Sequence, residues 1–268
     1  MIQVYRKIRQ QLLTQNKFQK YLMYAIGEVF LVVVGILLAL QFNNWSVEST
    51  NKTKEKWYLI NMVEDIEYQR GDLKYMKEHY EKRVKYSESI LRSYKKINNF
   101  QNIDSLNEKL NLLMEVDNFP NINNTYQELV SSGQQALITN KELSVSIIDY
   151  YLYSEDNYID IKNNNDNVFY RELHPLFYDL AQIIIIDDEL YDDQENLFET
   201  DDEVATILKK KLENDEIKIK FLNALKSLIL INKLQLEMID ETIEMGRILV
   251  QKIDDELGLT PDMVNQID

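Results

Sequence analysis

The longest apolar stretch of the chain lies near its N-terminus. Residues 21–42 read YLMYAIGEVFLVVVGILLALQF, and Glu28 is the only charged residue among positions 21–40. At about 1.5 Å per residue, twenty helical residues cover roughly 30 Å, the thickness of a bilayer's hydrocarbon core. Aromatic residues at both ends resemble interfacial belts, namely Tyr21, Tyr24, Phe42 and Trp45. The stretch predicts a transmembrane helix, and a cleaved signal peptide is the alternative.

Three-four spacing of apolar residues predicts two long helices, one after the apolar stretch and one near the C-terminus. The first seam contains Leu59, Met62, Ile66, Gln69, Leu73, Met76, Tyr80, Arg83, Ser87, Ile90 and Tyr94. The second contains Leu222, Leu225, Ile229, Asn232, Leu236, Ile239, Ile243, Gly246, Val250, Ile253 and Leu257, with Leu228, Ile231, Leu234 and Leu249 beside it. We expect the two helices to pack antiparallel with coiled-coil-like crossings. Asn232 either fixes their register or lies at a solvated edge.

Shorter helices are expected between these two. Residues 104–116 read as one helix, and the DNFPNINN loop follows at 117–124. Capping boxes predict three further helix starts, at Thr125 with Glu128, Thr139 with Glu142, and Thr200 with Glu203. The helix that starts at Thr125 is expected to end at Gly133, and the one that starts at Thr200 is expected to end near Glu213. The end of the helix that starts at Thr139 stays open, because the run 163–167 is rich in Asn. Asn214 is the expected N-cap of the last helix and Gly258 its stop.

The composition favours long helices over folds that need many turns. The 268 residues include only six Gly, three Pro and no Cys. Barrels, sandwiches, glycine-loop nucleotide folds, disulfides and thiolate zinc sites are therefore excluded. We expect an all-α fold in which the transmembrane helix continues into an antiparallel helical bundle with long first and last helices. The expected divisions are a tail at 1–20, a transmembrane helix at 21–42, a helical domain at 43–257 and a tail at 258–268.

The charge is divided unevenly along the chain. Residues 1–45 carry +4 of a total of −15, which leaves −19 for residues 46–268. The positive-inside rule then places the N-terminus in the cytoplasm and the helical domain in the periplasm, anchored in the inner membrane. Acidic residues concentrate at 187–203, which reads as a solvated loop or as a calcium site. This window would repel nucleic acid unless divalent ions bridged the two, so nucleic acid is not an expected partner.

The anchor region contains short sequence motifs that are more specific than its hydrophobicity alone. It reads RKIRQ from Arg6, NKF from Asn16, KYLMYAIGEVFLVVVGILLAL from Lys20 and QFNNW up to Trp45, and TYQELVSSG and DYY follow at 125–133 and 149–151. This wording resembles an uncharacterised domain-of-unknown-function family of single-span bacterial membrane proteins. The resemblance implies a membrane anchor with a helical exterior domain in Gram-negative bacteria, and it implies no assigned activity.

Three residues of the predicted span are candidates for contact with a partner helix. A carboxylate within hydrocarbon, such as Glu28, usually serves a function, although one near the interface can reach water. Gly35 and Ala39 form a small-xxx-small step, with Gly27 two turns earlier on the same face. Glu28, Gly35 and Ala39 are therefore the candidate intramembrane contact.

Candidate chemistry outside the membrane is sparse. The spacing of the six Gly excludes phosphate-binding and nucleophile-elbow motifs, and His79 and His174 are 95 positions apart. Each His reads as a solvated or capping residue, with a ligand or general base as the alternative. Aromatic residues gather between 150 and 178, and Tyr151, Tyr158, Tyr170 and Tyr178 are the candidate ligand or partner face. Their alternative role is to form core.

The sequence thus favours a non-catalytic, membrane-anchored helical interaction or assembly module of the cell envelope. Its expected partners are the lipid bilayer and either another envelope protein or a second copy, and it needs no cofactor. The alternative is a periplasmic ligand sensor that signals through a separate membrane partner. A hydrolase built on one of the two histidines is the third hypothesis.

Overall fold

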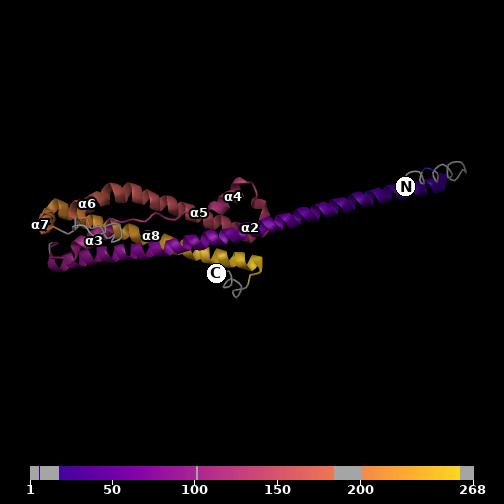
Figure 1. Cartoon of the computed structure of the whole chain (residues 1–268). Helices are drawn as coiled ribbons and strands as arrows, with labels where there is room; N and C mark the ends of the chain where they lie inside the picture. The colour runs from indigo at the N-terminus through magenta and orange to yellow at the C-terminus, as the bar shows by residue number, and fades with distance from the viewer. Residues whose placement is uncertain (1–5, 7–17, 101, 184–200, 260–268) are drawn as a thin grey trace, which may run out of the picture. The chain divides into compact units, whose positions relative to one another are not determined.

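The computed structural model describes residues 6, 18–100, 102–183 and 201–259 (Figure 1). Every regular element within these ranges is a helix, so the predicted all-α class is confirmed for the described part of the chain. Most of the predicted tail at 1–20, the acidic window up to residue 200 and the tail from residue 260 lie outside the described residues.

The chain divides into two compact units, residues 1–57 and 58–268. Helix α2, Phe18–Ile97, is 80 residues long and contributes to both units, so the predicted continuation of the apolar helix is confirmed. In the first unit, most of the large apolar side chains between Leu22 and Phe42 are exposed. This helix is long and apolar enough to cross a membrane.

The second unit is built from the remainder of α2 and the helices that follow it. These are α3 (Leu106–Leu113), α4 (Asn124–Ser131), the 3₁₀ helix η1 (Gln135–Leu137), α5 (Lys141–Asn164), the π-helix η2 (Asn165–Leu173), α6 (His174–Leu180), α7 (Asp202–Lys211) and α8 (Asp215–Leu257). Within this unit, α5 and α8 run beside α2 (Figure 1).

Two ion pairs give the relative direction of α2 and α8. Lys77 Nζ lies 2.6 Å from Asp240 Oδ1, and Lys233 Nζ lies 2.9 Å from Glu88 Oε1. Residue numbers therefore rise along one helix while they fall along the other. The predicted antiparallel packing of the long first and last helices is confirmed.

The buried face of α2 is the predicted seam. Every seam residue from Leu59 to Ile90 is buried, including the polar Gln69, Arg83 and Ser87, and Tyr94 is partly buried. A helix that keeps this spacing over several turns presents one continuous stripe to its neighbours. The periodicity therefore predicted which side of α2 packs.

The buried face of α8 is shifted relative to the predicted seam. Leu225, Asn232, Ile239, Gly246 and Ile253 are buried as expected, but the alternate seam positions Leu222, Ile229, Leu236, Ile243, Val250 and Leu257 are only partly buried. Their places are taken by residues one position earlier, Phe221, Leu228, Gln235, Thr242 and Leu249. Among the residues expected beside the seam, Leu234 is exposed. The prediction selected apolar residues and so missed the buried Gln235 and Thr242; α8 packs against both α2 and α5, and Thr242 accepts a hydrogen bond from Asn157 of α5.

Three apolar clusters form the core of the second unit, and α2 contributes to each of them. The first core includes Leu59, Met62, Ile66, Leu143, Ile147, Tyr150, Tyr151, Leu249 and Ile253. The second core is Leu73, Met76, Tyr80, Phe119, Ile161 and Ile239. The third core includes Ile90, Phe100, Leu110, Phe169, Phe177, Phe221 and Leu225. Along α2, Gln69 lies between the first and second cores, and Arg83 and Ser87 lie between the second and third.

The helix caps partly follow the sequence prediction. Asn214 caps α8 by accepting from the backbone N–H groups of Glu216 and Ile217, and Gly258 ends the helix at a φ of 70°, both as predicted. Gly133, at a φ of 68°, follows α4 in the same way. The three capping boxes are wrong by one or two residues. The residues at the N-cap positions are Asn123 for α4, Asn140 for α5 and Asp201 for α7.

Two stretches differ from the expected helix content. The predicted helix at 104–116 is shorter, because Ser105 has a left-handed backbone and the helix ends at Leu113. The Asn-rich run 163–167 is helical throughout, since α5 passes directly into η2. Asn165 is buried there, and its side-chain amide donates to the Asp117 carbonyl at 3.0 Å. That contact offsets the low helix propensity of Asn.

The two glycines inside the helical part of the second unit provide a test of this packing. A Cβ on Gly246 would lie 3.1 Å from Ile66 Cγ2 and 3.0 Å from Arg70 Cδ, whereas a Cβ on Gly71 would meet nothing within 4 Å. Gly246→Leu should lower the free energy of unfolding by about 1–3 kcal/mol through overpacking. Gly71→Ala should raise it by about 1 kcal/mol through helix propensity. Thermal and denaturant unfolding of the full chain in detergent measures both. Equal effects of the two substitutions would contradict the described α2–α8 contact.

Candidate functional site

Polar contacts of the second unit converge on the segment between α3 and α4. Residues 114–123 form no helix, yet they lie against the cores, and Phe119 is buried in the second core. A buried segment without secondary structure needs partners for its backbone groups. Side chains from α2 and η2 supply those partners, so this segment is the most connected polar region that the structure describes.

Gln69 forms the first polar layer, between the first and second cores. Its Nε2 lies 2.6 Å from the Pro120 carbonyl oxygen and 2.7 Å from Ser154 Oγ. The Tyr150 hydroxyl donates to Gln69 Oε1 at 2.8 Å. A single buried amide therefore joins α2, the 114–123 segment and α5. Close by on α5, Asn157 donates to Thr242 of α8 at 3.0 Å.

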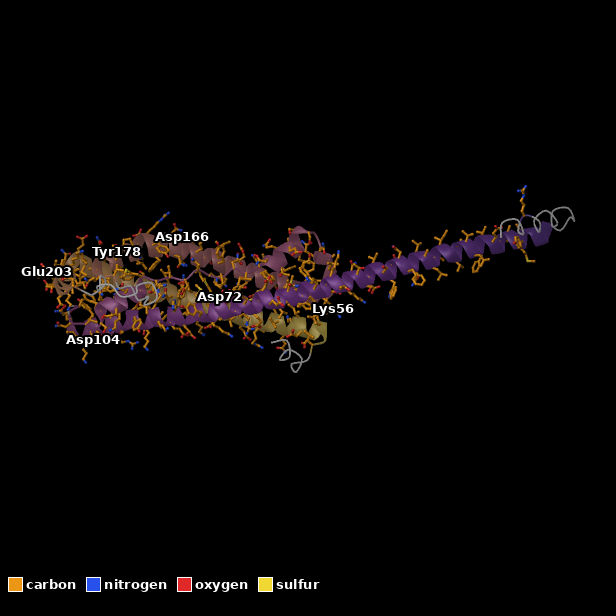
Figure 2. The ribbon with its side chains drawn as sticks, viewed as in Figure 1. Lys56, Asp72, Asp104, Asp166, Tyr178 and Glu203 are labelled. Atoms are coloured by element: carbon orange, nitrogen blue, oxygen red, sulfur yellow. The ribbon has the colours of Figure 1, made fainter. Side chains whose placement is uncertain are left out.

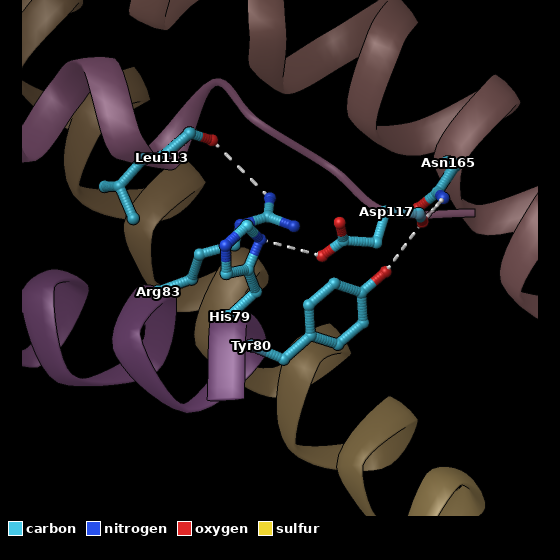
Figure 3. A network of polar contacts seen from close by, with 6 residues as sticks. All are labelled: His79, Tyr80, Arg83, Leu113, Asp117 and Asn165. Carbon is cyan, nitrogen blue, oxygen red and sulfur yellow. Dashed lines mark hydrogen bonds and ion pairs between the residues drawn. The ribbon is translucent and has the colours of Figure 1, made fainter. Parts of the chain in front are cut away.

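Asp117 is the centre of the second set of contacts (Figure 3). Its carbonyl oxygen accepts from the Tyr80 hydroxyl at 3.2 Å and from Asn165 Nδ2 at 3.0 Å. Its carboxylate Oδ2 lies 3.1 Å from His79 Nδ1, and both side chains are partly exposed. His79 is thus paired with a carboxylate, which the sequence analysis did not anticipate. Burial raises the pKa of the Tyr80 hydroxyl above its ordinary value.

Arg83 is the most deeply buried charged side chain of this region. Its guanidinium carbon lies 4.9 Å from the Phe169 ring centroid and 5.4 Å from that of Tyr80, and its Nη2 reaches the Leu113 carbonyl only at 3.5 Å. Burial lowers the pKa of Arg83 to about 10, so the group remains charged at neutral pH. The two aromatic faces lie within cation–π distance and stabilise the charged form.

Arg83 and Ser87 of α2, with Asn232 and Gln235 of α8, form the second polar layer. The ion pairs Lys77–Asp240 and Glu88–Lys233 bring the two stretches opposite each other. Asn232 is buried, so it does not lie at a solvated edge. Each of the four residues has one buried polar atom without a hydrogen-bond partner among the described residues, namely Arg83 Nε, Ser87 Oγ, Asn232 Nδ2 and Gln235 Nε2.

The four candidate tyrosines do not share one surface. Tyr151 is buried in the first core, stacked on Tyr126 with ring centroids 4.4 Å apart, and Tyr158 packs partly against the second core. Tyr170 and Tyr178 are exposed, with the His174 ring between them at centroid distances of 5.9 and 6.1 Å. Tyr178 lies at the surface of the second unit (Figure 2). Only Tyr170 and Tyr178 are open to a partner.

The intramembrane candidates all belong to the first unit and to one helix. Glu28, Gly35 and Ala39 are exposed, and a Cβ on Gly35 would meet nothing within 4 Å. Their spacings of seven and four residues place them on one face of α2. The structure therefore leaves this face open to a neighbouring helix.

The described residues do not assemble a metal centre, since no three His, Asp or Glu side chains come within ligand distance of one ion there. The pair of His79 and Asp117 has the geometry of a base with its orienting carboxylate. Among the described contacts, no Ser or Thr hydroxyl is bonded to this pair. The sequence analysis missed Asp117 and Asn165, although the polar residues at seam positions of α2 mark where such contacts fall.

Two adjacent tyrosines test the first polar layer. Tyr150→Phe leaves Gln69 Oε1 without its donor and should lower the free energy of unfolding by about 1–2 kcal/mol. Tyr151→Phe should leave it unchanged or raise it, because the buried Tyr151 hydroxyl has no partner among the described residues. Denaturant unfolding of the full chain in detergent measures the difference. A larger loss for Tyr151→Phe would refute the assigned contacts.

The same tyrosines predict loss of stability at high pH. Burial raises the pKa of Tyr80, Tyr150 and Tyr151 above the ordinary value of 10.0. Above that pH the unfolded chain releases protons that the folded chain retains, so the free energy of unfolding should fall as pH rises past 10. Tyr151→Phe should make this fall shallower. Tyrosinate absorbance followed during alkaline unfolding is the measurement, and titration of all tyrosines before unfolding is the contrary result.

Comparison with known proteins gave one family. Neither curated proteins nor solved structures provided a significant match. The model of a family of unknown function, DUF6090, matches residues 28–176, which include most of the apolar part of α2, the 114–123 segment and all of α5. The resemblance to an uncharacterised family is confirmed at this level, and the chain belongs to the DUF6090 family of unknown function.

Proposed function

We propose that this chain is a non-catalytic interaction or assembly module, anchored by one helix in the inner membrane of a bacterial cell envelope. The observation that carries the proposal is the continuity of α2, Phe18–Ile97. One helix contains both a stretch apolar enough to cross a membrane and the residues around which the cores of the second unit form. An anchor that is also the central packing element suits a module held at a membrane surface.

The distribution of charge supports the orientation. The basic residues before the span favour a cytoplasmic N-terminus, and the acidic remainder favours a periplasmic second unit. The anionic cytoplasmic leaflet would repel an acidic domain. We therefore assign the helical domain to the periplasm.

The surfaces that are open to contact support interaction over ligand sensing. A sensor would use the tyrosines of α5 to line a binding cavity, but Tyr150 and Tyr151 are packed in the first core. The Glu28, Gly35 and Ala39 face of α2 suits lateral contact with a helix of another envelope protein or of a second copy. The interaction module and the alternative ligand sensor would both use that contact.

The orientation can be tested cleanly because the chain contains no Cys. Lys96→Cys places a single thiol at the exposed end of α2, and Gln10→Cys places one in the N-terminal tail. A membrane-impermeant maleimide should label Lys96→Cys in intact spheroplasts and Gln10→Cys only after permeabilisation. The reverse pattern would overturn the assigned topology.

The proposed interaction predicts a complex larger than the monomer in native membranes. Chemical cross-linking before extraction, followed by native electrophoresis in mild detergent, should detect it. Gly35→Leu should reduce the share of complex several-fold by preventing close helix approach. Leu37→Ala, on the opposite side of the same helix, should leave it unchanged. A chain that stays monomeric under all these conditions would contradict the proposed function.

A further inference from the structure

Helix α5 has a second apolar stripe, on the side away from the cores. Val145, Ile148, Leu152 and Ile159 are 56%, 40%, 57% and 44% exposed, while Leu143, Ile147, Tyr151 and Ile161 of the same helix are buried. At about 100° per residue, the exposed four lie roughly opposite the buried ones. An amphipathic helix needs only one apolar stripe to pack against its own domain. The second stripe is therefore available to something else.

The exposed stripe follows a heptad rhythm. Val145, Leu152 and Ile159 are seven residues apart, and Ile148 follows Val145 by three. These are the spacings of a and d positions in a coiled coil, and the next two d positions of this register hold Glu155 and Lys162. Together the four side chains expose roughly 300 Å² of apolar surface, comparable with the largest patches of monomeric proteins, which are often functional.

One flank of this stripe is acidic with the same repeat. Glu142, Asp149 and Asp156 are also seven residues apart, and all three are exposed. With Val145 at an a position, these three residues occupy e positions, where charges select the partner helix in coiled coils. On the opposite side, Ser144 and Tyr158 are partly buried and Tyr151 is buried in the first core, so no line of charge at this heptad spacing is exposed there. The surface is thus an apolar stripe with one line of negative charge.

We propose that this face of α5 binds a helix of another protein that presents an apolar a/d stripe flanked by Lys or Arg at heptad spacing. Charge complementarity selects this occupant, because the acidic line would otherwise face solvent or repel. A second copy anchored in the same membrane would pair in parallel and would bring no line of basic residues to the acidic one. The proposal deepens, and rests on, the function proposed above, since it names the partner chemistry of an interaction module.

Other exposed apolar residues lack this combination and provide the control. Leu230 of α8 is 63% exposed, but the nearest charges on its own helix face are basic, Lys226 and Lys233. A basic helix has no reason to bind there. Lys233 is also paired with Glu88, so Leu230→Glu and Leu152→Glu make the same chemical change on a surface of mixed charge and on an acidic one.

The test uses the full chain in phosphatidylcholine nanodiscs and a synthetic three-heptad peptide with Leu at a and d and Lys at e and g. Fluorescence anisotropy should show binding that Leu152→Glu weakens about tenfold and that Leu230→Glu changes less than about twofold. The triple variant Glu142→Lys, Asp149→Lys, Asp156→Lys should lose the Lys peptide and gain the peptide with Glu in place of Lys. Empty nanodiscs and a peptide with scrambled Leu positions should not bind.

Three results would overturn the proposal. The first is that Leu152→Glu and Leu230→Glu weaken binding equally, or that the scrambled peptide binds as well as the designed one. Either outcome would show that an acidic protein attracts any basic peptide without using this face. A disulfide-linked dimer formed by the single-thiol variant Leu152→Cys in native membranes would assign the face to a second copy. Absence of peptide binding, while the native complex still depends on Gly35, would remove this partner and leave the proposed function standing.

Discussion

The structure of the second unit depends on one constraint, the burial of a single face of α2 from Leu59 to Ile90. Its residues recur every three or four positions and supply apolar contacts to all three cores. Helix α8 supplies the facing side, and its residues from Phe221 to Ile253 also reach all three cores. Because α8 and α5 must both cover this face, their positions follow from it. The cores are therefore ordered along α2 and are not arranged around a central point.

The same face contains Gln69, Arg83 and Ser87, and a buried polar side chain is unfavourable unless it finds partners. Gln69 finds three, two of them side chains of α5 and one a carbonyl of the 114–123 segment. Arg83 finds two aromatic faces and one distant carbonyl. Gln69 therefore holds the 114–123 segment in place beside the first polar layer. The second polar layer retains polar atoms without a hydrogen-bond partner among the described residues. The first layer is the better fixed of the two.

The sequence predicted the helix class, the seam of α2 and the caps of α8, because each depends on residues within a few turns of one another. It placed the α8 seam partly one residue away, since that helix has two neighbours and buries the polar Gln235 and Thr242 beside its apolar residues. It could not reveal the contacts of Gln69 with Pro120 and Tyr150, whose partners are 51 and 81 residues distant in the chain. The capping boxes failed for a local reason, as Asn140 and Asp201 are better N-caps than the threonines beside them.

The first polar layer also determines what α5 shows to its surroundings. Tyr150 and Ser154 meet Gln69, and Asn157 meets Thr242, so hydrogen bonds to two different helices fix the rotation of α5 about its axis. A slip of one residue would turn the helix by about 100° and break all of these bonds. Apolar packing alone would tolerate such a slip more readily, since α5 has apolar residues on both sides. These buried hydrogen bonds therefore keep Val145, Leu152 and Ile159 on the exposed side of α5. The residues that α5 exposes are determined by hydrogen bonds inside the core.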